Sequence, residues 1–377
     1  MTITGVAAFV AAGLVLVGCG SSTAPSSSPR TRPGVLSTSI PSSTAASVTT
    51  TIAVPVRKVF APGTFDSTDA RLEERVQAAG LSGGMIRIVG ADGGVIHEHT
   101  VGDVSGATQL AVASSAKWFT AATFMTFVDQ GVIALDDDIS QWLPEFVGSN
   151  PPITARQLLT HTSGVRDNSC QDDGTPLATC VRTLASSARE FAPGSRFSYG
   201  NSPFLVVGRL IEVLGDSDFA TVVQQRVTGP LGMDATTWPG APTAANPAFG
   251  ASVTVDDYGK FLDMILHGGV SNGTRVLSSD VVAQMISDQV SHYDTSQDFS
   301  VGITGIPRYG LGCWPDVQDQ SHQTAVVSGN GGKGFYPWVD LTTGTWGIVG
   351  VQDERGAPVA VPASQLVEVE ARTAVAR

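Results

Sequence analysis

Ser114 and Lys117 are the two side chains of this sequence whose types and spacing best suit covalent chemistry. They lie three residues apart where an apolar pattern of helical period begins, which runs from Ser115 to Gln130. On a helix both side chains would share one face, about 5 to 6 Å apart between Cβ atoms. Free N–H groups at a helix start also favour developing negative charge. The spacing therefore lets a hydroxyl and an amine meet, but chance supplies such a pair often, so the motif is weak by itself. For Lys117 to act as a base, its pKa must fall well below about 10.4.

A second candidate is the segment Tyr199-Gly200-Asn201, which directly precedes another helical pattern. A tyrosine and an asparagine two residues apart in a tight turn can present both side chains to one cleft. The phenol could transfer a proton and the amide could hold a substrate. The same residues are also compatible with an ordinary turn.

Histidine-rich and acidic segments offer other kinds of site. His161 could suggest a Ser-His arrangement, and His97 and His99 on one strand face could suggest a metal pair. The metal pair lacks a third ligand at a recognisable spacing, so a solvated strand face is the simpler interpretation. The run 136–138 consists of three aspartates and is interpreted as a solvated turn. We therefore expect neither a metal site nor a cofactor.

Composition limits the possible partners. The 377 residues include 22 Lys plus Arg against 34 Asp plus Glu, a net charge of −12. A phosphate backbone would be repelled by this charge, so nucleic-acid binding is disfavoured. The oligomeric state is not indicated by the sequence.

The N-terminus carries the signals of export. Residues 1–18 contain a short apolar run that ends before Cys19, and the segment resembles a bacterial lipoprotein signal peptide, although no basic residue precedes the apolar run. Cleavage would leave a lipidated Cys19 that anchors the protein on the outer side of the cell membrane. A buried helix or a plain transmembrane anchor is the alternative. Residues 19–62, rich in Ser, Thr and Pro, are expected to form an extended tether.

The remaining cysteines suggest one disulfide. Cys170 and Cys180 are close in sequence across a polar loop, and an exported protein can keep them oxidised. Cys313 lies in an apolar run and is expected to be a buried thiol.

The order of elements predicts an α/β fold. Two strand patterns, 85–89 and 95–101, flank Asp92-Gly93 as in a hairpin, and strand patterns return at 309–314, 325–328, 334–340 and 345–352. Helical patterns occupy 68–79, 203–214, 255–267 and 362–374. Strands at both ends with helices between them predict one antiparallel sheet flanked by helices and interrupted by a mostly helical insertion. The predicted folded body spans 63–377, with sheet parts at about 63–112 and 305–377 and the helical part at about 113–304.

Together these segments resemble the serine β-lactamase and penicillin-binding-protein superfamily, in its class C β-lactamase, DD-peptidase and esterase branch. The resemblance extends from about Gly83 to Glu354, and the segments that carry it, besides Ser114-x-x-Lys117, are Leu158–Gly164, Pro193–Asn201, Phe249–Gly269 and Tyr309–Gly312. It implies an α/β sheet domain with a helical domain. It also implies that Ser114 is the nucleophile, Lys117 the activating base, Tyr199 a second proton-transfer group and Asn201 a substrate contact, while His161 lies in a structural stretch.

The third motif of the resemblance is altered in this chain. Relatives place Lys-Thr-Gly or His-x-Gly on the strand that lines the cleft, and the matching stretch here is 327–335. Aligning on Gly334-Phe335 puts Ser328 at the position of the Lys or His, without the charge. A backbone N–H near Gly331, together with that of Ser114, would form the oxyanion hole. Because Ser328 carries no charge, a substrate carboxylate would lose a counter-ion, although Lys333 could replace it.

The sequence thus predicts a serine hydrolase that acts on a small-molecule or cell-wall acyl substrate, an ester or neutral amide, through a covalent ester on Ser114. A D-alanyl-D-alanine carboxypeptidase or a β-lactamase is the alternative within the same machinery. A non-catalytic envelope lipoprotein is the alternative from another class.

Overall fold

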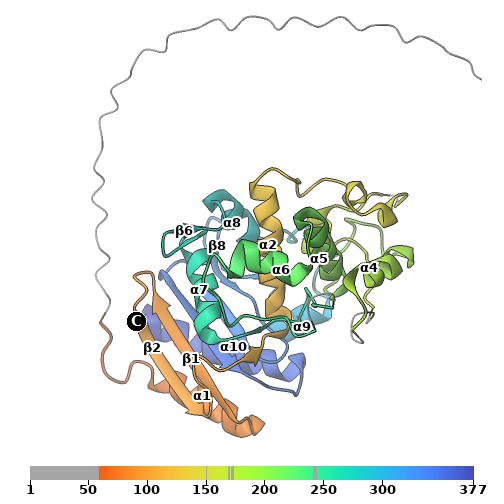
Figure 1. The fold of residues 1–377 in the computed structure, drawn as a ribbon. Helices are drawn as coiled ribbons and strands as arrows, with labels where there is room; N and C mark the ends of the chain where they lie inside the picture. The colour runs from red at the N-terminus through yellow and green to blue at the C-terminus, as the bar shows by residue number, and fades with distance from the viewer. Residues whose placement is uncertain (1–58, 150, 169, 171–173, 241–243) are drawn as a thin grey trace, which may run out of the picture. The chain divides into compact units, whose positions relative to one another are not determined.

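A six-stranded antiparallel sheet organises the protein. The computed structural model describes residues 59–149, 151–168, 170, 174–240 and 244–377. The predicted signal peptide, Cys19 and most of the predicted tether lie outside the described residues. The strand order is β2-β1-β10-β9-β8-β7, and each neighbouring pair is antiparallel (Figure 1). The strands are β1 (Gly83–Gly90), β2 (Val95–Gly102), β7 (Trp314–Gln318), β8 (Thr324–Ser328), β9 (Tyr336–Asp340) and β10 (Thr345–Val351).

The sheet is buried on both faces. In β1, Met85 belongs to one apolar cluster and its neighbour Ile86 to the other, as the alternation of side chains along a strand requires. The cluster of Ile86 includes side chains of α1 (Asp66–Ala79) and α10 (Ala357–Ala376). The cluster of Met85 continues into the helical part of the chain. The sheet is thus the middle layer between the terminal helices and the inserted ones (Figure 1).

The inserted part is mainly helical. Its central helix, α2 (Ala116–Asp129), is buried along nearly its whole length and packs against α5 (Ser202–Gly215). Side chains that cap the backbone mark several helix starts, for example Thr254, which accepts the N–H of Asp257 at 3.0 Å. The other helices are α3 (Ala155–Leu159), α4 (Leu177–Ser186), α6 (Phe219–Val223), α7 (Val255–Leu266), α8 (Ser279–Ile286) and α9 (Phe299–Thr304). Two short ribbons pair β3 (Leu110–Ala111) with β4 (Ser252–Val253) and β5 (Val270–Ser271) with β6 (Thr274–Arg275).

The predicted fold class is confirmed, with two local differences. Residues 309–313, predicted as part of a strand, form a turn, because Gly312 has a left-handed φ of 79° and Leu311 donates its N–H to the carbonyl of Met285 at 2.9 Å. The last helix begins at Ala357, five residues before the predicted start, and Pro362 lies inside it. Ala360 and Val361 are buried there, so packing against the sheet extends the helix.

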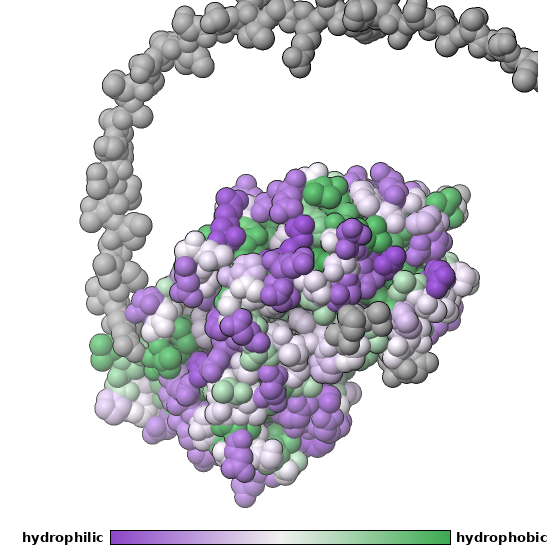
Figure 2. Space-filling model, in the orientation of Figure 1, coloured by the Kyte–Doolittle hydropathy of each residue, from purple (hydrophilic) through white to green (hydrophobic). Residues whose placement is uncertain are grey.

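The described cysteines are placed as expected. Cys170 and Cys180 are joined by a disulfide with their Cα atoms 5.4 Å apart, and Cys313 is a buried free thiol. Within the described ranges, no helix is both long and apolar enough to cross a membrane. On the face that Figure 2 shows, apolar residues form small groups between polar ones.

Candidate active site

Ser114 lies in a short 3₁₀ helix, Ala113–Ser115, that leads directly into α2. Ala113 has a left-handed φ of 47°, an uncommon conformation for a residue with a Cβ atom. Backbone strain of this kind persists where the surrounding structure enforces it, often beside reactive groups. The turn places the Ser114 hydroxyl at the N-terminal end of a 14-residue helix.

Lys117 directs its amine at Ser114. Its Nζ lies 3.1 Å from Ser114 Oγ, 2.9 Å from Asn201 Oδ1 and 3.1 Å from the carbonyl oxygen of Ala248. The side chain is fully buried. Three contacts in three directions therefore fix the amine beside the hydroxyl.

Burial gives this amine its chemistry. Desolvation lowers the pKa of Lys117 to about 7, and the nearby carboxylate of Asp167 acts in the opposite direction. Near neutral pH a substantial fraction of the amine is therefore uncharged. An uncharged amine 3.1 Å from a hydroxyl can accept its proton.

Tyr199 also lies beside Ser114, and the centroid of its ring is 5.0 Å from Lys117 Nζ. Burial raises the pKa of Tyr199, a hydrogen bond with Ser114 lowers it, and the charges of Asp298 and Asp167 raise it. The net direction is upward, so the phenol keeps its proton across the ordinary pH range. The ring packs against Trp314, with centroids 5.5 Å apart.

Asp167 holds the turn that carries Tyr199 and Asn201. One of its carboxylate oxygens accepts the N–H groups of Asn201 at 2.8 Å and of Ser202 at 2.7 Å, where α5 begins. Asp298 accepts the N–H of Tyr199 at 3.0 Å. Neither carboxylate is predicted by the sequence. They come from distant loops, and no spacing in the sequence connects them with the turn.

His161 also contacts the turn that carries Tyr199 and Asn201. It is buried, and its Nδ1 accepts the N–H of Gly200 at 3.3 Å while its Nε2 lies 3.3 Å from the hydroxyl of Tyr309. Burial and the charge of Lys117 lower the pKa of His161 well below its usual value, so the ring is neutral. Its contacts are structural, as the sequence suggested.

The end of β8 lies against the segment that carries Ser114. A Cβ atom added to Gly331 would meet the carbonyl oxygen of Val112 at 2.1 Å and Ser115 Oγ at 2.9 Å, and one added to Gly329 would meet the Trp118 ring at 2.6 Å. Only residues without a side chain allow this approach. The glycines therefore bring the strand backbone up to the nucleophile.

The two residues predicted on this strand require correction. The Ser328 side chain is fully buried and its hydroxyl donates to Asp316 Oδ1 at 3.0 Å. Asp316 also lies near Glu368 and Arg372 of α10, so Ser328 points to the sheet face opposite α2. Gly331 donates its N–H to the carbonyl of Phe335 at 2.8 Å, which leaves it no proton for an oxyanion. Neither residue is placed as a substrate contact.

The backbone N–H of Asn330 is available as an oxyanion donor, unlike that of Gly331. The N–H groups of Gly329 and Gly331 donate to the carbonyls of Pro337 and Phe335, on the side of β9. Successive N–H groups of an extended strand point in opposite directions. The N–H of Asn330 therefore points away from β9. Within the described part of the chain, the backbone N–H groups of Asn330 and Ser114 make no hydrogen bond.

Other sequence candidates lie elsewhere. Lys333 pairs with Glu354 at 2.8 Å on the surface, His97 contacts Asp69 at 2.6 Å, and His99 contacts Glu73 at 3.1 Å. No group of metal-ligating side chains occurs among the residues described.

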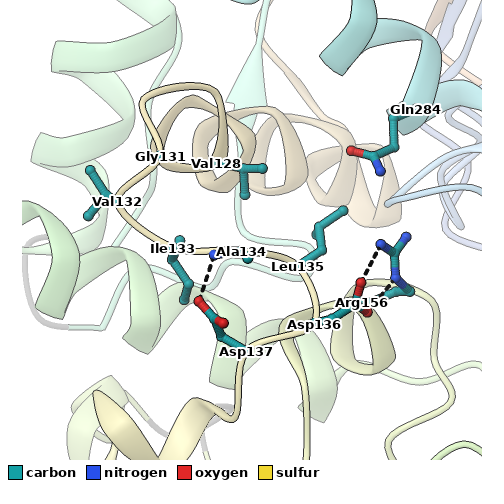
Figure 3. A pocket seen from close by; sticks show the side chains of 10 residues that line it. All are labelled: Val128, Gly131, Val132, Ile133, Ala134, Leu135, Asp136, Asp137, Arg156 and Gln284. Atoms are coloured by element: carbon teal, nitrogen blue, oxygen red, sulfur yellow. Dashed lines mark hydrogen bonds and ion pairs between the residues drawn. The ribbon is translucent and has the colours of Figure 1, made fainter.

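A pocket at the far end of α2 is a separate feature. Figure 3 shows it beside Val128 and Gly131, with Asp136 facing Arg156 and forming an ion pair at 2.7 Å. Ser114 is at the opposite end of the 14-residue helix, a separation of about 20 Å at 1.5 Å per residue. The acidic run thus helps to form a surface turn and not the site around Ser114.

Comparison with known proteins identifies the chain. The profile described as Beta-lactamase matches residues 69–370, most of the described structure. The chain belongs to the beta-lactamase family.

Relatives of this beta-lactamase family protein differ in their described activities. Penicillin-binding protein 4 of Amycolatopsis lactamdurans is 27% identical over 262 residues, which cover 58% of this chain and 69% of the relative. Esterase EstB of Burkholderia gladioli is 35% identical over 147 residues, 33% of this chain and 37% of the esterase. A solved structure from Bacteroides dorei, described as a candidate beta-lactamase, is 29% identical, covers 83% of this chain and 99% of its own, and has a TM-score of 0.74. The superfamily comprises serine hydrolases with penicillin-binding and esterase members.

Proposed function

We propose that this protein is a serine hydrolase that forms a covalent acyl-enzyme on Ser114. The observation that carries the proposal is the 3.1 Å contact between the Ser114 hydroxyl and the amine of Lys117, whose pKa is lowered to about 7. A buried and partly uncharged amine is a suitable base for a serine hydroxyl.

The chemistry would run in two halves. Ser114 Oγ bonds to the substrate carbonyl carbon and its proton passes to Lys117, while the amides of Ser114 and Asn330 stabilise the oxyanion. When the tetrahedral species collapses, Tyr199 donates a proton to the leaving oxygen and regains one from the Lys117 ammonium. Water then attacks the Ser114 ester, and its proton replaces the one that Ser114 lost. This proposal includes membership of the class C branch of the family, whose Ser-x-x-Lys motif would be Ser114 and Lys117.

We infer esters or neutral amides as the substrates, because the site carries negative charge. Asp167 and Asp298 both act electrostatically on Tyr199, and Lys117 is partly neutral. Lys333 is held by Glu354, and the strand end 327–332 contains no cationic residue. A substrate carboxylate would find no counter-ion on this strand. The similarity to an esterase supports the same choice.

Substrate profiling tests this proposal. The wild type should hydrolyse neutral p-nitrophenyl esters, a fluorophosphonate probe should label Ser114, and Ser114→Ala should abolish both signals. Faster turnover of a chromogenic cephalosporin or a D-alanyl peptide than of neutral esters would favour the β-lactamase or carboxypeptidase alternative, which the penicillin-binding relative makes reasonable. No turnover together with no labelling would favour a non-catalytic lipoprotein.

We also propose that the protein is anchored outside the cytoplasmic membrane through an acylated Cys19. The support is the apolar run before Cys19 and the Ser/Thr/Pro-rich stretch after it. Mass spectrometry should find the mature N-terminus at lipidated Cys19, and Cys19→Ala should block processing or release the protein from membranes. An unmodified N-terminus at Met1 would contradict this location.

A further inference from the structure

The aromatic ring of Phe299 lies beside the candidate active site and remains exposed. It is 62% exposed, and it is the only aromatic residue among the large apolar side chains that are exposed in the described ranges. Single exposed apolar residues are common and need no explanation by themselves. Phe299 differs because its helix is fixed in place and its ring lies against Tyr199.

The ring of Phe299 contacts a residue that touches the nucleophile. Its centroid lies 6.1 Å from that of Tyr199, in an edge-to-face arrangement. Tyr199 in turn lies close enough to Ser114 for the Ser114 hydroxyl to lower the pKa of its phenol. One side chain therefore separates the exposed ring from the reacting hydroxyl.

The position of Phe299 is fixed at both ends of its helix. Asp298, which precedes α9, accepts the N–H of Tyr199 with Oδ2 at 3.0 Å and the N–H of Ser300 with Oδ1 at 2.9 Å. At the other end, Gln365 of α10 donates to the carbonyl of Thr304 at 3.1 Å. One carboxylate thus couples the turn of Tyr199 to the helix of Phe299. Figure 1 shows α9 between the inserted helices and α10.

Tyr199, the residue that the Phe299 ring contacts, borders an apolar cluster. Trp314 packs against Tyr199 with centroids 5.5 Å apart and continues into an apolar cluster with Phe197, Val290, Ile306 and Tyr309. The carboxylate of Asp298, which directly precedes this helix, already has two N–H partners. An aliphatic or aromatic substituent would bury the Phe299 ring at little polar cost.

We propose that Phe299 is a specificity-determining residue that binds an apolar chain of the substrate, so that the preferred substrates are esters with an extended hydrophobic group. This inference rests on the proposed hydrolase function. The hydrophobic group can belong to the acyl part or to the alcohol part of the ester, and both are recognised by the same contact.

Two ester series test the inference. The first varies the acyl chain of p-nitrophenyl esters from acetate to octanoate, and the second varies the alcohol of butyrate esters from methyl to octyl. Phe299→Ala should lower kcat/KM for the long chain of one series about five- to thirtyfold, mainly through KM, and change the short-chain value less than about twofold. The series that responds identifies the part of the ester that Phe299 binds.

Matched variants separate substrate contact from structural support. Phe299→Leu should restore most of the long-chain activity, because leucine keeps apolar area at the same position. Leu366→Ala removes a side chain of α10 that is 55% exposed, and it should leave the selectivity unchanged. Equal losses for short and long chains, or no change in either series, would overturn the role of Phe299. If wild-type Ser114 is labelled but no ester chain length is preferred, the inference fails while the hydrolase function stands; if Ser114 is never labelled and no ester is cleaved, both fail.

Discussion

The amine of Lys117 lies 2.9 Å from the amide oxygen of Asn201, closer than its 3.1 Å distance to the Ser114 hydroxyl. A neutral acceptor at this position holds the amine without adding a charge that would stabilise the ammonium form. The lowered pKa of Lys117 therefore depends on residue 201 being an amide.

Replacing this amide by an acid should disable the base near neutral pH. Asn201→Asp is nearly isosteric, and a carboxylate at this distance should raise the pKa of Lys117 by about one to three units. The acidic limb of the kcat/KM profile for a neutral ester, expected near pH 7 in the wild type, should move to higher pH. Activity at pH 7 should fall about fivefold or more and recover in alkaline buffer. A uniform loss at all pH values would instead indicate a damaged site.

Asp167→Asn should have the opposite effect on the same limb. The carboxylate of Asp167 raises the pKa of Lys117, so its removal should lower that pKa and move the acidic limb to lower pH. The asparagine oxygen can still accept the N–H groups of Asn201 and Ser202. The pH profiles of kcat/KM for wild type and variant, measured in parallel, show in which direction the acidic limb moves. An unmoved limb would mean that another group controls it.

Tyr199→Phe should remove proton transfer but keep the aromatic packing. We expect kcat to fall about 10²- to 10⁴-fold with a small change in KM, the range for loss of a general acid or base. Tyr293→Phe is the matched control, since Tyr293 borders the same apolar cluster and, within the described structure, makes no contact with Ser114. Comparable activity of the Tyr199 variant and wild type would exclude the phenol from the mechanism.

Ser328→Ala should affect stability and leave catalysis intact. The substitution removes a buried hydrogen bond to Asp316, so the free energy of unfolding should fall by about 1 to 2 kcal/mol. Urea unfolding measures this loss, while kcat/KM for a neutral ester should stay within about twofold. A change in substrate selectivity at unchanged stability would return Ser328 to the substrate site.

The disulfide should stabilise the body. Cys170 and Cys180 are ten residues apart, and closing a loop of this size contributes on the order of 2 to 3 kcal/mol in the chain-entropy picture. Non-reducing peptide mapping of protein from its native compartment should find this pair bonded, and a double Ser variant should melt at lower temperature. Two free thiols, or a bond from either to Cys313, would contradict the pairing.

Local patterns in the sequence predicted most of the fold. The helical period after Ser115, the hairpin turn at Asp92-Gly93 and the cap at Thr254 each depend on neighbouring residues, and the structure has an element at each place. Lys117 was found for the same reason, because three residues on a helix fix its direction towards Ser114.

The errors lie where the direction of a side chain depends on register or on distant packing. Ser328 was placed by counting back from Gly334 across a turn, and on a strand a shift of one residue moves a side chain to the opposite face. Asp167 and Asp298 approach the turn of Tyr199 only in the folded chain, so no local spacing could indicate them. Phe299 was missed because its exposure is a property of the structure.

The pairing of β1 with β10 has a consequence for how the protein folds. The buried guanidinium of Arg75 donates to the carbonyl of Ala360, 285 residues further along the chain, and all of β10 pairs with residues 84–90 of β1. Contacts between such distant segments slow folding, because a long loop must close before they can form. The sheet that supports Ser114 cannot be completed until the last strand has been synthesised. We therefore expect the nascent chain to remain inactive, and any product truncated before β10 to be degraded or to aggregate.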